Sequence, residues 1–149
     1  MTLLETHVQR LLDSFKKWTG RELIARTGDP AGDARALFDA PFVIVSHGTQ
    51  ADPILNYGNA AALILWEVDW GRLTAMPSRE TAEPMHREER EQFMNKVRRD
   101  GFVSGYGGIR ISSTGKRFRI EDAVIWNVLD EAGAVVGQAA MFERWRACS

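Results

Sequence analysis

The last third of the chain, from Gly101 to Trp145, most constrains the fold because its pattern predicts three long strands joined by tight turns. The three runs cover residues 102–112, 116–129 and 135–145. The first turn is Ser113-Thr114-Gly115 and the second is Asp130-Glu131-Ala132-Gly133. Gly and Asp are residues that hairpin loops favour. The sequence therefore predicts a three-stranded antiparallel meander with an apolar face that the rest of the chain has to cover.

The central run alternates apolar and polar residues, which predicts one buried and one wetter face. Asp122 falls in the apolar phase, so in a strand without a bulge its carboxylate would point into the core. A buried carboxylate needs a cationic partner or stays protonated, and Arg79 and Arg110 are the candidate partners. The apolar members of this phase are Phe118, Ile120, Val124, Trp126 and Val128.

The pattern of residues 2–18 predicts an amphipathic helix. Thr2 and Glu5 have the spacing of a capping box, and the apolar side chains that follow recur at helical spacing. This helix either packs on its own domain or forms a dimer interface, and the pattern leaves both open. Loop-forming residues at 27–33 then suggest an N-terminal helix and loop at 1–40 and a core at 41–149.

The middle of the chain supplies the remaining elements. Short β-branched runs at 42–46 and 54–57 predict two strands. Asn59 is a favourable cap for a helix over 60–66, and a second long helix is expected over 84–99. We therefore predict an α+β fold: a five-stranded antiparallel sheet with helices packed on one face and an extra N-terminal helix.

Composition limits the partners of this chain. Nineteen basic and twenty acidic residues give a formal charge of −1, so no global field attracts nucleic acid or an anionic membrane. The basic residues Arg110, Lys116, Arg117 and Arg119 are better explained as the solvated side of a strand. The longest apolar run, 60–66, is too short to span a membrane. With one cysteine and no signal-peptide pattern, we expect a cytoplasmic protein with neither a nucleic-acid nor a membrane partner.

The element order resembles that of PAS domains, whose C-terminal half is defined by two hairpins such as those at 113–118 and 129–137. Further motifs are similar to those of the MEKHL domain, a PAS-like family, and the resemblance extends over essentially the whole chain. It implies a sensory or regulatory fold, without a settled ligand or reaction. The motifs are Pro41–Gly48, Asn56–Asn59, Leu65–Glu67, Pro77–Pro84, Arg87–Arg90 and Gly137–Phe142.

PAS domains can hold flavin, haem or a thiol-linked chromophore, so the resemblance makes each of these a candidate cofactor for this chain. A flavin adduct or a thiol-linked chromophore needs a well-placed cysteine, and Cys148 lies in the tail. Haem needs an axial ligand, for which His86 has the most suitable place. Its neighbours Glu83, Arg87, Glu88 and Glu89 indicate a wet helix end and argue against haem. The cofactor stays unassigned.

A ligand pocket is the hypothesis that best uses the polar residues. Gln138 is flanked by the small residues Gly137, Ala139 and Ala140, which leave space on a central strand. We predict a sensory domain that binds a small molecule or a protein partner and forms a homodimer through the N-terminal helix or the sheet, rather than an enzyme, with no catalytic or metal-ligating residues. The candidate ligand-binding residues are Asn56, Tyr57, Trp66, Arg79, Tyr106, Arg110, Asp122, Trp126 and Gln138.

Two alternatives remain open. The first is a ligand-free interaction module, a homodimer through the N-terminal helix or the sheet, whose core its own side chains fill. The weaker second alternative is a small enzyme that uses Asp122 as a buried carboxylate beside an arginine. No hydrolase, zinc or phosphate-loop motif supports that enzyme.

Overall fold

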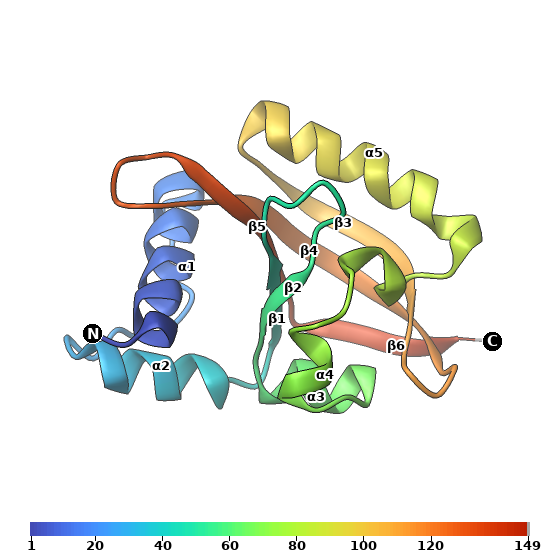
Figure 1. Cartoon of the computed structure of the whole chain (residues 1–149), viewed down its shortest axis with the longest axis horizontal. Coiled ribbons are helices and arrows are strands. Elements are labelled where there is room, and N and C mark those ends of the chain that lie inside the picture. The colour runs from blue at the N-terminus through green and yellow to red at the C-terminus, as the bar shows by residue number, and fades with distance from the viewer. Residues whose placement is uncertain (149) are drawn as a thin grey trace.

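The computed structural model describes residues 1–148, except for the side chains of Pro84 and Met85. The chain forms helices, then two strands, then further helices and finally the long strands, in the order that the sequence predicts (Figure 1). The elements are α1 (Leu3–Thr19), α2 (Pro30–Phe38), β1 (Val43–His47), β2 (Leu55–Gly58), α3 (Ala60–Trp66), α4 (Trp70–Leu73), the 3-10 helix η1 (Ser78–Thr81), α5 (Pro84–Asp100), β3 (Phe102–Ile111), β4 (Arg117–Leu129), β5 (Val135–Phe142) and β6 (Arg144–Cys148).

The strands form one antiparallel sheet in the order β2-β1-β5-β4-β3. One edge of β4 pairs with β3. Its other edge is shared, since β5 pairs with Val124–Leu129 and β6 with Arg117–Glu121. The predicted strand at 135–145 is thus divided at Glu143 into β5 and β6, which gives six strands where the sequence suggested five.

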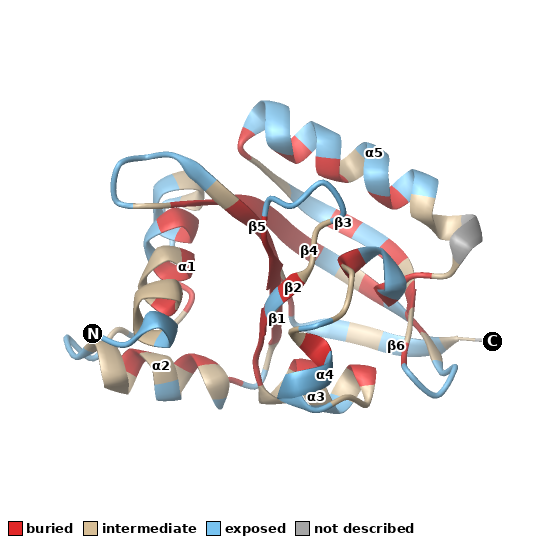
Figure 2. Ribbon diagram, in the orientation of Figure 1, coloured by how far each residue is buried: buried red, intermediate tan, exposed pale blue. Residues whose placement is uncertain are grey.

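Helices cover both faces of the sheet. Figure 1 shows α1 and α2 on one side and α3, α4 and α5 on the other. Two separate cores result, and in Figure 2 the buried residues of α1 and α5 lie on the sides that face the sheet. The α1-side core contains Val8, Leu11, Leu12, Phe15, Leu37, Ile44, Tyr57, Val124, Trp126 and Val128 among others. The α5-side core contains Val43, Ala62, Trp66, Met94, Val97, Tyr106, Phe118, Ile120, Ile125 and Phe142 among others.

The ends of α1 follow the sequence prediction. The Thr2 hydroxyl accepts from the Glu5 N–H, and the Glu5 carboxylate accepts from the Thr2 N–H, which completes the capping box. Gly20 ends the helix at φ 75°, a left-handed conformation that glycine adopts without strain. The apolar side of α1 packs on its own sheet, so the residues that suggested a dimer contact are occupied within the chain.

A bulge at Asp122 changes which residues of β4 share a face. Tyr106 pairs with Ala123 whereas Gly108 pairs with Ile120, so three residues of β4 span a stretch that two residues of β3 cover. Asp122 itself has φ 52°, which Asp tolerates better than most residues. The prediction of one continuous apolar phase is therefore wrong. Before the bulge the phase faces α5, and after it the same phase faces α1.

The expectation that Asp122 points into the core is wrong for the same reason. Its side chain is 65% exposed and forms an ion pair with Arg144 of β6. The predicted partners lie elsewhere: Arg79 pairs with Asp52 at 3.1 Å, and Arg110 is buried on the α5 side. The weaker enzyme hypothesis thereby loses the buried carboxylate on which it depended.

The loop predicted at 27–33 is shorter in the structure because α2 begins at Pro30. The Asp29 carboxylate accepts from the Gly32 N–H at 3.2 Å and caps the helix. Proline suits a first helical position, where its missing N–H is no loss. Cap and proline together start the helix within the stretch that was predicted as a loop.

Asn59 caps α3 as predicted, and its contacts extend beyond that helix. Its Oδ1 accepts from the N–H groups of Ala62 and Ile44, both at 3.2 Å. Its Nδ2 donates to the carbonyls of Phe42 at 2.8 Å and Leu37 at 3.3 Å. This fully buried side chain therefore joins the end of α2, the start of β1 and the start of α3.

We expect Asn59→Ala to lower the free energy of unfolding by about 2–4 kcal/mol. A lost cap alone costs about 1 kcal/mol, and a buried group left unpaired costs about 1–3 kcal/mol more. Urea denaturation measures the change, with Asp69→Ala, which removes the exposed cap of α4, as the control. Equal losses in the two variants would contradict the additional role of Asn59.

Candidate functional site

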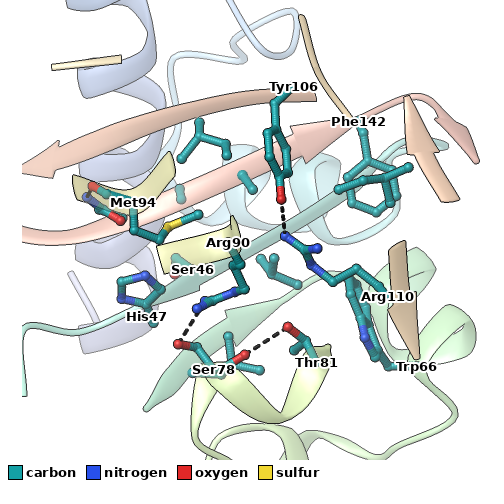
Figure 3. A pocket seen from close by; sticks show the side chains of 17 residues that line it. Ser46, His47, Trp66, Ser78, Thr81, Arg90, Met94, Tyr106, Arg110 and Phe142 are labelled. Carbon is teal, nitrogen blue, oxygen red and sulfur yellow. Dashed lines mark hydrogen bonds between the residues drawn. The ribbon is translucent and has the colours of Figure 1, made fainter. Parts of the chain in front are cut away.

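A small cavity lies between the sheet and the segment formed by η1 and α5 (Figure 3). Its free space for water-sized spheres is about 50 Å³. Since one water molecule needs about 10–15 Å³ on this scale, the cavity has room for roughly three to five waters. Its lining includes His47 from β1, Trp66 from α3, Ser78 from η1, Arg90 and Met94 from α5, Tyr106 and Arg110 from β3, and Gln138 and Ala140 from β5.

Arg110 enters the cavity from β3. Tyr106, Gly108 and Arg110 alternate along the strand and so share a face. Arg110 donates from Nη2 to the Tyr106 hydroxyl at 2.8 Å and from Nη1 to the Ile109 carbonyl at 2.9 Å. A Cβ atom at Gly108 would lie 2.8 Å from the Tyr106 hydroxyl and 3.1 Å from Arg110 Nη1. Glycine at 108 therefore gives this pair its room.

Arg90 enters from the opposite wall. It lies one turn before Met94 on the side of α5 that faces the sheet, and its Nη2 donates to Ser78 Oγ at 3.0 Å. Burial, with the positive charge of Arg110 as the second cause, lowers the pKa of Arg90 to about 10. At that value the guanidinium is still charged at neutral pH. The cavity therefore contains two cations close enough to affect each other.

The other polar groups of the cavity are only partly satisfied. Gln138 donates from Nε2 to the Met94 carbonyl at 3.1 Å and to Asn127 Oδ1 at 3.3 Å. Its Oε1 and the indole Nε1 of Trp66 are buried without a partner in the described part of the chain. Buried polar groups usually have partners, so these two atoms indicate groups that water or a ligand would satisfy.

His47 adds an uncharged group to this wall. Its Nδ1 lies 2.9 Å from the Gly48 carbonyl, an acceptor, so Nδ1 carries the proton and Nε2 is the acceptor. Burial lowers the pKa of His47, although the Gly48 carbonyl acts in the opposite direction. The imidazole is therefore neutral near pH 7, and the positive charge of the cavity comes from the arginines.

Four of the nine candidate residues line this cavity, namely Trp66, Tyr106, Arg110 and Gln138. The structure does not place the other five there. Tyr57 and Trp126 lie in the α1-side core, and Asn56 is an exposed residue that accepts from Ser46 Oγ at 2.5 Å. Arg79 and Asp122 form the surface ion pairs described above. The candidate residues do not form one site because helices cover both faces of the sheet. Aromatic and apolar side chains are therefore divided between two cores.

Arg90 is the residue that sequence reasoning missed. Its signal was present, since Arg90 precedes Met94 and Val97 by four and seven residues and so continues their apolar stripe. A charged residue within an apolar stripe indicates a buried charge with a particular task. Ser78, which accepts from Arg90, gave no comparable signal because it lies in a short 3-10 helix.

The cavity does not fit the cofactors that PAS domains can carry. Cofactor-sized ligands occupy sites of about 300–1,000 Å³, far above the space between the two arginines. Cys148 lies at the end of β6 and does not line the cavity, and neither does His86 in the first turn of α5. Among the described residues, no three His, Cys, Asp or Glu side chains gather as a metal site would require.

Comparison with known proteins settles the family. The family model described as the MEKHLA domain matches residues 5–147. This chain belongs to the MEKHLA domain family. The family recognised from the sequence motifs is thus confirmed, and α1 lies within the matched region from Glu5 onward.

Curated relatives contain the MEKHLA domain as part of a longer protein. The homeobox-leucine zipper protein HOX9 of Oryza sativa subsp. indica is 26% identical over 137 residues, which are 91% of this chain and 16% of HOX9. HOX32 of Oryza sativa subsp. japonica is 26% identical over 134 residues, 89% of this chain and 16% of HOX32. The chain spans about one sixth of the length of these relatives.

Solved structures confirm the PAS fold. A PAS domain from Colwellia psychrerythraea superposes with a TM-score of 0.65 at 18% identity, covering 79% of this chain and 95% of that domain. A light-oxygen-voltage domain studied with a flavin analogue gives a TM-score of 0.61 at 17% identity, covering 78% and 84%. Family and fold together show a MEKHLA domain with a PAS-like fold. Among the helices of residues 1–148, none has the length and apolar character that crossing a membrane requires.

Proposed function

We propose that this MEKHLA domain senses a small molecule that binds between the sheet and α5. The observation that carries the proposal is the cavity itself, where Gln138 Oε1 of β5 and Trp66 Nε1 of α3 are buried without a partner among the described residues. A core filled by its own side chains would leave no such space and would pair these groups. Charged and amide side chains around a small apolar space are typical of ligand sites.

The hydrogen bonds around the cavity suggest how binding reaches the rest of the domain. Arg90 joins α5 to η1 through Ser78, and Gln138 joins β5 to α5 through the Met94 carbonyl. If α5 has two positions on the sheet, a ligand that binds Arg90 or Gln138 more tightly in one of them shifts the equilibrium toward that position. The output is thus a change in how α5 and η1 rest on the sheet.

The relatives support a regulatory role for the domain. In the rice homeobox-leucine zipper proteins the matching region is about one sixth of the chain. A conformational change in the domain would therefore act on the other parts of such a protein. A homodimer, the alternative function, would have to use surfaces other than the apolar side of α1, because that side is buried in its own core. No protein partner is assigned.

Filling the cavity provides the test. We expect Ala140→Val, which adds two methyl groups on the cavity side, to change the free energy of unfolding by less than about 1 kcal/mol and to abolish any ligand-induced rise in melting temperature. The matched control is Ala139→Val, because Ala139 borders the cavity but its side chain belongs to the α1-side core on the opposite face of the sheet. Overpacking that closed core should cost about 1–3 kcal/mol.

Thermal unfolding with a metabolite set, together with native mass spectrometry of freshly purified protein, provides the readout. A retained small molecule, or a metabolite whose effect disappears in Ala140→Val and persists in Ala139→Val, would support the proposal. If Ala140→Val destabilises as much as Ala139→Val and no compound binds the wild type, the sensing role is wrong.

A further inference from the structure

Two buried arginines face the cavity without a buried carboxylate beside them. Arg90 and Arg110 are each only 6% exposed. Among the described residues that line the cavity, none is acidic. The carboxylate of Glu91 lies 3.9 Å from Arg90 Nη1, but it is 53% exposed and also pairs with Arg98 at 3.6 Å. Two positive charges therefore lie in a desolvated space with little compensation.

Most of the donor capacity of these arginines is free. Each guanidinium carries five N–H donors. In the described part of the chain, Arg90 uses its donors on Ser78 Oγ, and Arg110 on the Tyr106 hydroxyl and the Ile109 carbonyl. The Tyr106 hydroxyl accepts from Arg110, so its own proton is available to a further acceptor. The Trp66 Nε1 adds another buried donor without a partner. The groups around the arginines that can still bond are thus donors, while Gln138 Oε1 and His47 Nε2 remain as acceptors elsewhere in the cavity.

Such a surplus of charge and donors is costly in an empty cavity. A buried charge is normally paired, because removal from water is not repaid without an opposite charge and further hydrogen bonds. An oxyanion repays both costs, since its oxygens accept several hydrogen bonds and carry the compensating charge. The guanidinium fork matches carboxylate, phosphate and sulfate oxygens in particular.

We propose that the cavity binds a small oxyanion, a carboxylate, a phosphate or a sulfate, between Arg90 of α5 and Arg110 of β3. This inference rests on the ligand-sensing role proposed above and names the chemistry of the ligand. In Figure 3 the two arginine side chains lie between Tyr106 on one side and Ser78 and Thr81 on the other. An oxyanion at this place forms ion pairs with an arginine of α5 and an arginine of β3, and so connects the helix to the sheet.

The free space sets the size of the ligand. About 50 Å³, or roughly three to five waters, suits one oxyanion group with few further atoms. Because Arg90 belongs to α5 and Arg110 to β3, the oxyanion replaces the repulsion between them with attraction to both. Binding therefore stabilises the packing of α5 on the sheet. The sensing role requires such a ligand-dependent change in the position of α5.

Thermal unfolding of the full chain tests this inference with sodium acetate, sodium phosphate and sodium sulfate. Each salt is added at low millimolar concentration, with sodium chloride keeping the ionic strength constant. We expect a saturable rise in melting temperature of about 5–10 °C at a hundredfold excess over the dissociation constant. A rise with acetate alone assigns a carboxylate ligand. A rise with phosphate or sulfate alone assigns a tetrahedral oxyanion.

Variants separate the site from general salt effects, since sulfate and phosphate also stabilise proteins by exclusion from their surface. Arg90→Met and Arg110→Met should lose the saturable rise while their ligand-free melting temperature stays equal or increases, because each removes an uncompensated buried cation. The matched control is Arg79→Met, which removes an exposed arginine paired with Asp52 and should keep the full rise. Arg90→Lys and Arg110→Lys keep the positive charge, and they replace the methionine variants in this test if a methionine variant does not fold. They should weaken binding at least tenfold, because the fork is lost.

Isothermal titration of the wild type with the same anions gives a second readout that needs no variant. Equal melting temperatures in all four sodium salts, with no heat of binding, would overturn the oxyanion. If an uncharged compound instead binds in an Ala140-dependent way, the sensing role stands and only the oxyanion inference fails. If the saturable rise survives in both arginine variants, the anion binds elsewhere and the inference is overturned.

Discussion

Deletion of residues 1–20 is expected to give a chain that aggregates instead of a folded monomer. Four side chains of α1 are at most 1% exposed because they pack on the sheet, namely Val8, Leu11, Leu12 and Phe15. Burial of one such side chain stabilises by about 1.5–3 kcal/mol, so the four contribute roughly 6–12 kcal/mol. That is comparable to the whole stability of a typical domain, about 5–15 kcal/mol.

Deletion would also uncover a continuous apolar surface on the sheet, and such surfaces promote aggregation. Size-exclusion chromatography with light scattering and circular dichroism measure the outcome. The matched control is Leu3→Ser, on the same helix at a residue that is 92% exposed, which should leave folding unchanged. A folded, soluble monomer from residues 21–149 would show that α1 is an appendage, as a separate segment at 1–40 would suggest.

Trp126→Ala is expected to lower the free energy of unfolding by about 3–5 kcal/mol, the range for removing a large aromatic side chain from a core. Trp126 is fully buried, and its ring packs edge-on against that of Phe15 with centroids 5.0 Å apart. Its indole Nε1 has no partner in the described part of the chain, so the loss comes from packing and not from a broken hydrogen bond. Urea denaturation measures the change.

The control and a double variant make this result specific. Trp70→Ala removes a tryptophan that is 37% exposed and should cost much less. Phe15→Ala combined with Trp126→Ala should show a coupling of about 0.5–1.5 kcal/mol, because the two rings are in contact. A Trp126→Ala protein within error of the wild type would contradict the packing of α1 on β4.

The elements of this protein were readable from the sequence where local chemistry determines them. The capping box of Thr2 and Glu5 and the Asn59 cap depend on groups within a few residues of one another. The turns between the long strands are equally local. Such signals, with the spacing of the apolar residues, were enough to give the order of elements, while the family came from the resemblance of several short motifs to those of the MEKHL domain.

The faces of the sheet were decided by tertiary structure. Alternation in β4 predicts one buried face only if the strand is regular, and the bulge at Asp122 interrupts it. Beyond the bulge both faces are covered, so Ile125 and Trp126 are neighbours in sequence and belong to different cores. Trp126 therefore left the predicted site, while Tyr106 and Gln138 stayed in it.

The candidate site also depends on contacts that no local pattern contains. Arg110 was visible as a residue of a long strand, and Arg90 as a charge within the apolar stripe of a helix. Arg90 and Arg110 are twenty residues apart in the chain, and they line one cavity because α5 packs on β3. Sequence determines which side chains carry charge and which segments form helices and strands. Only the tertiary structure decides which charges share a desolvated space, because that depends on long-range packing and not on propensity.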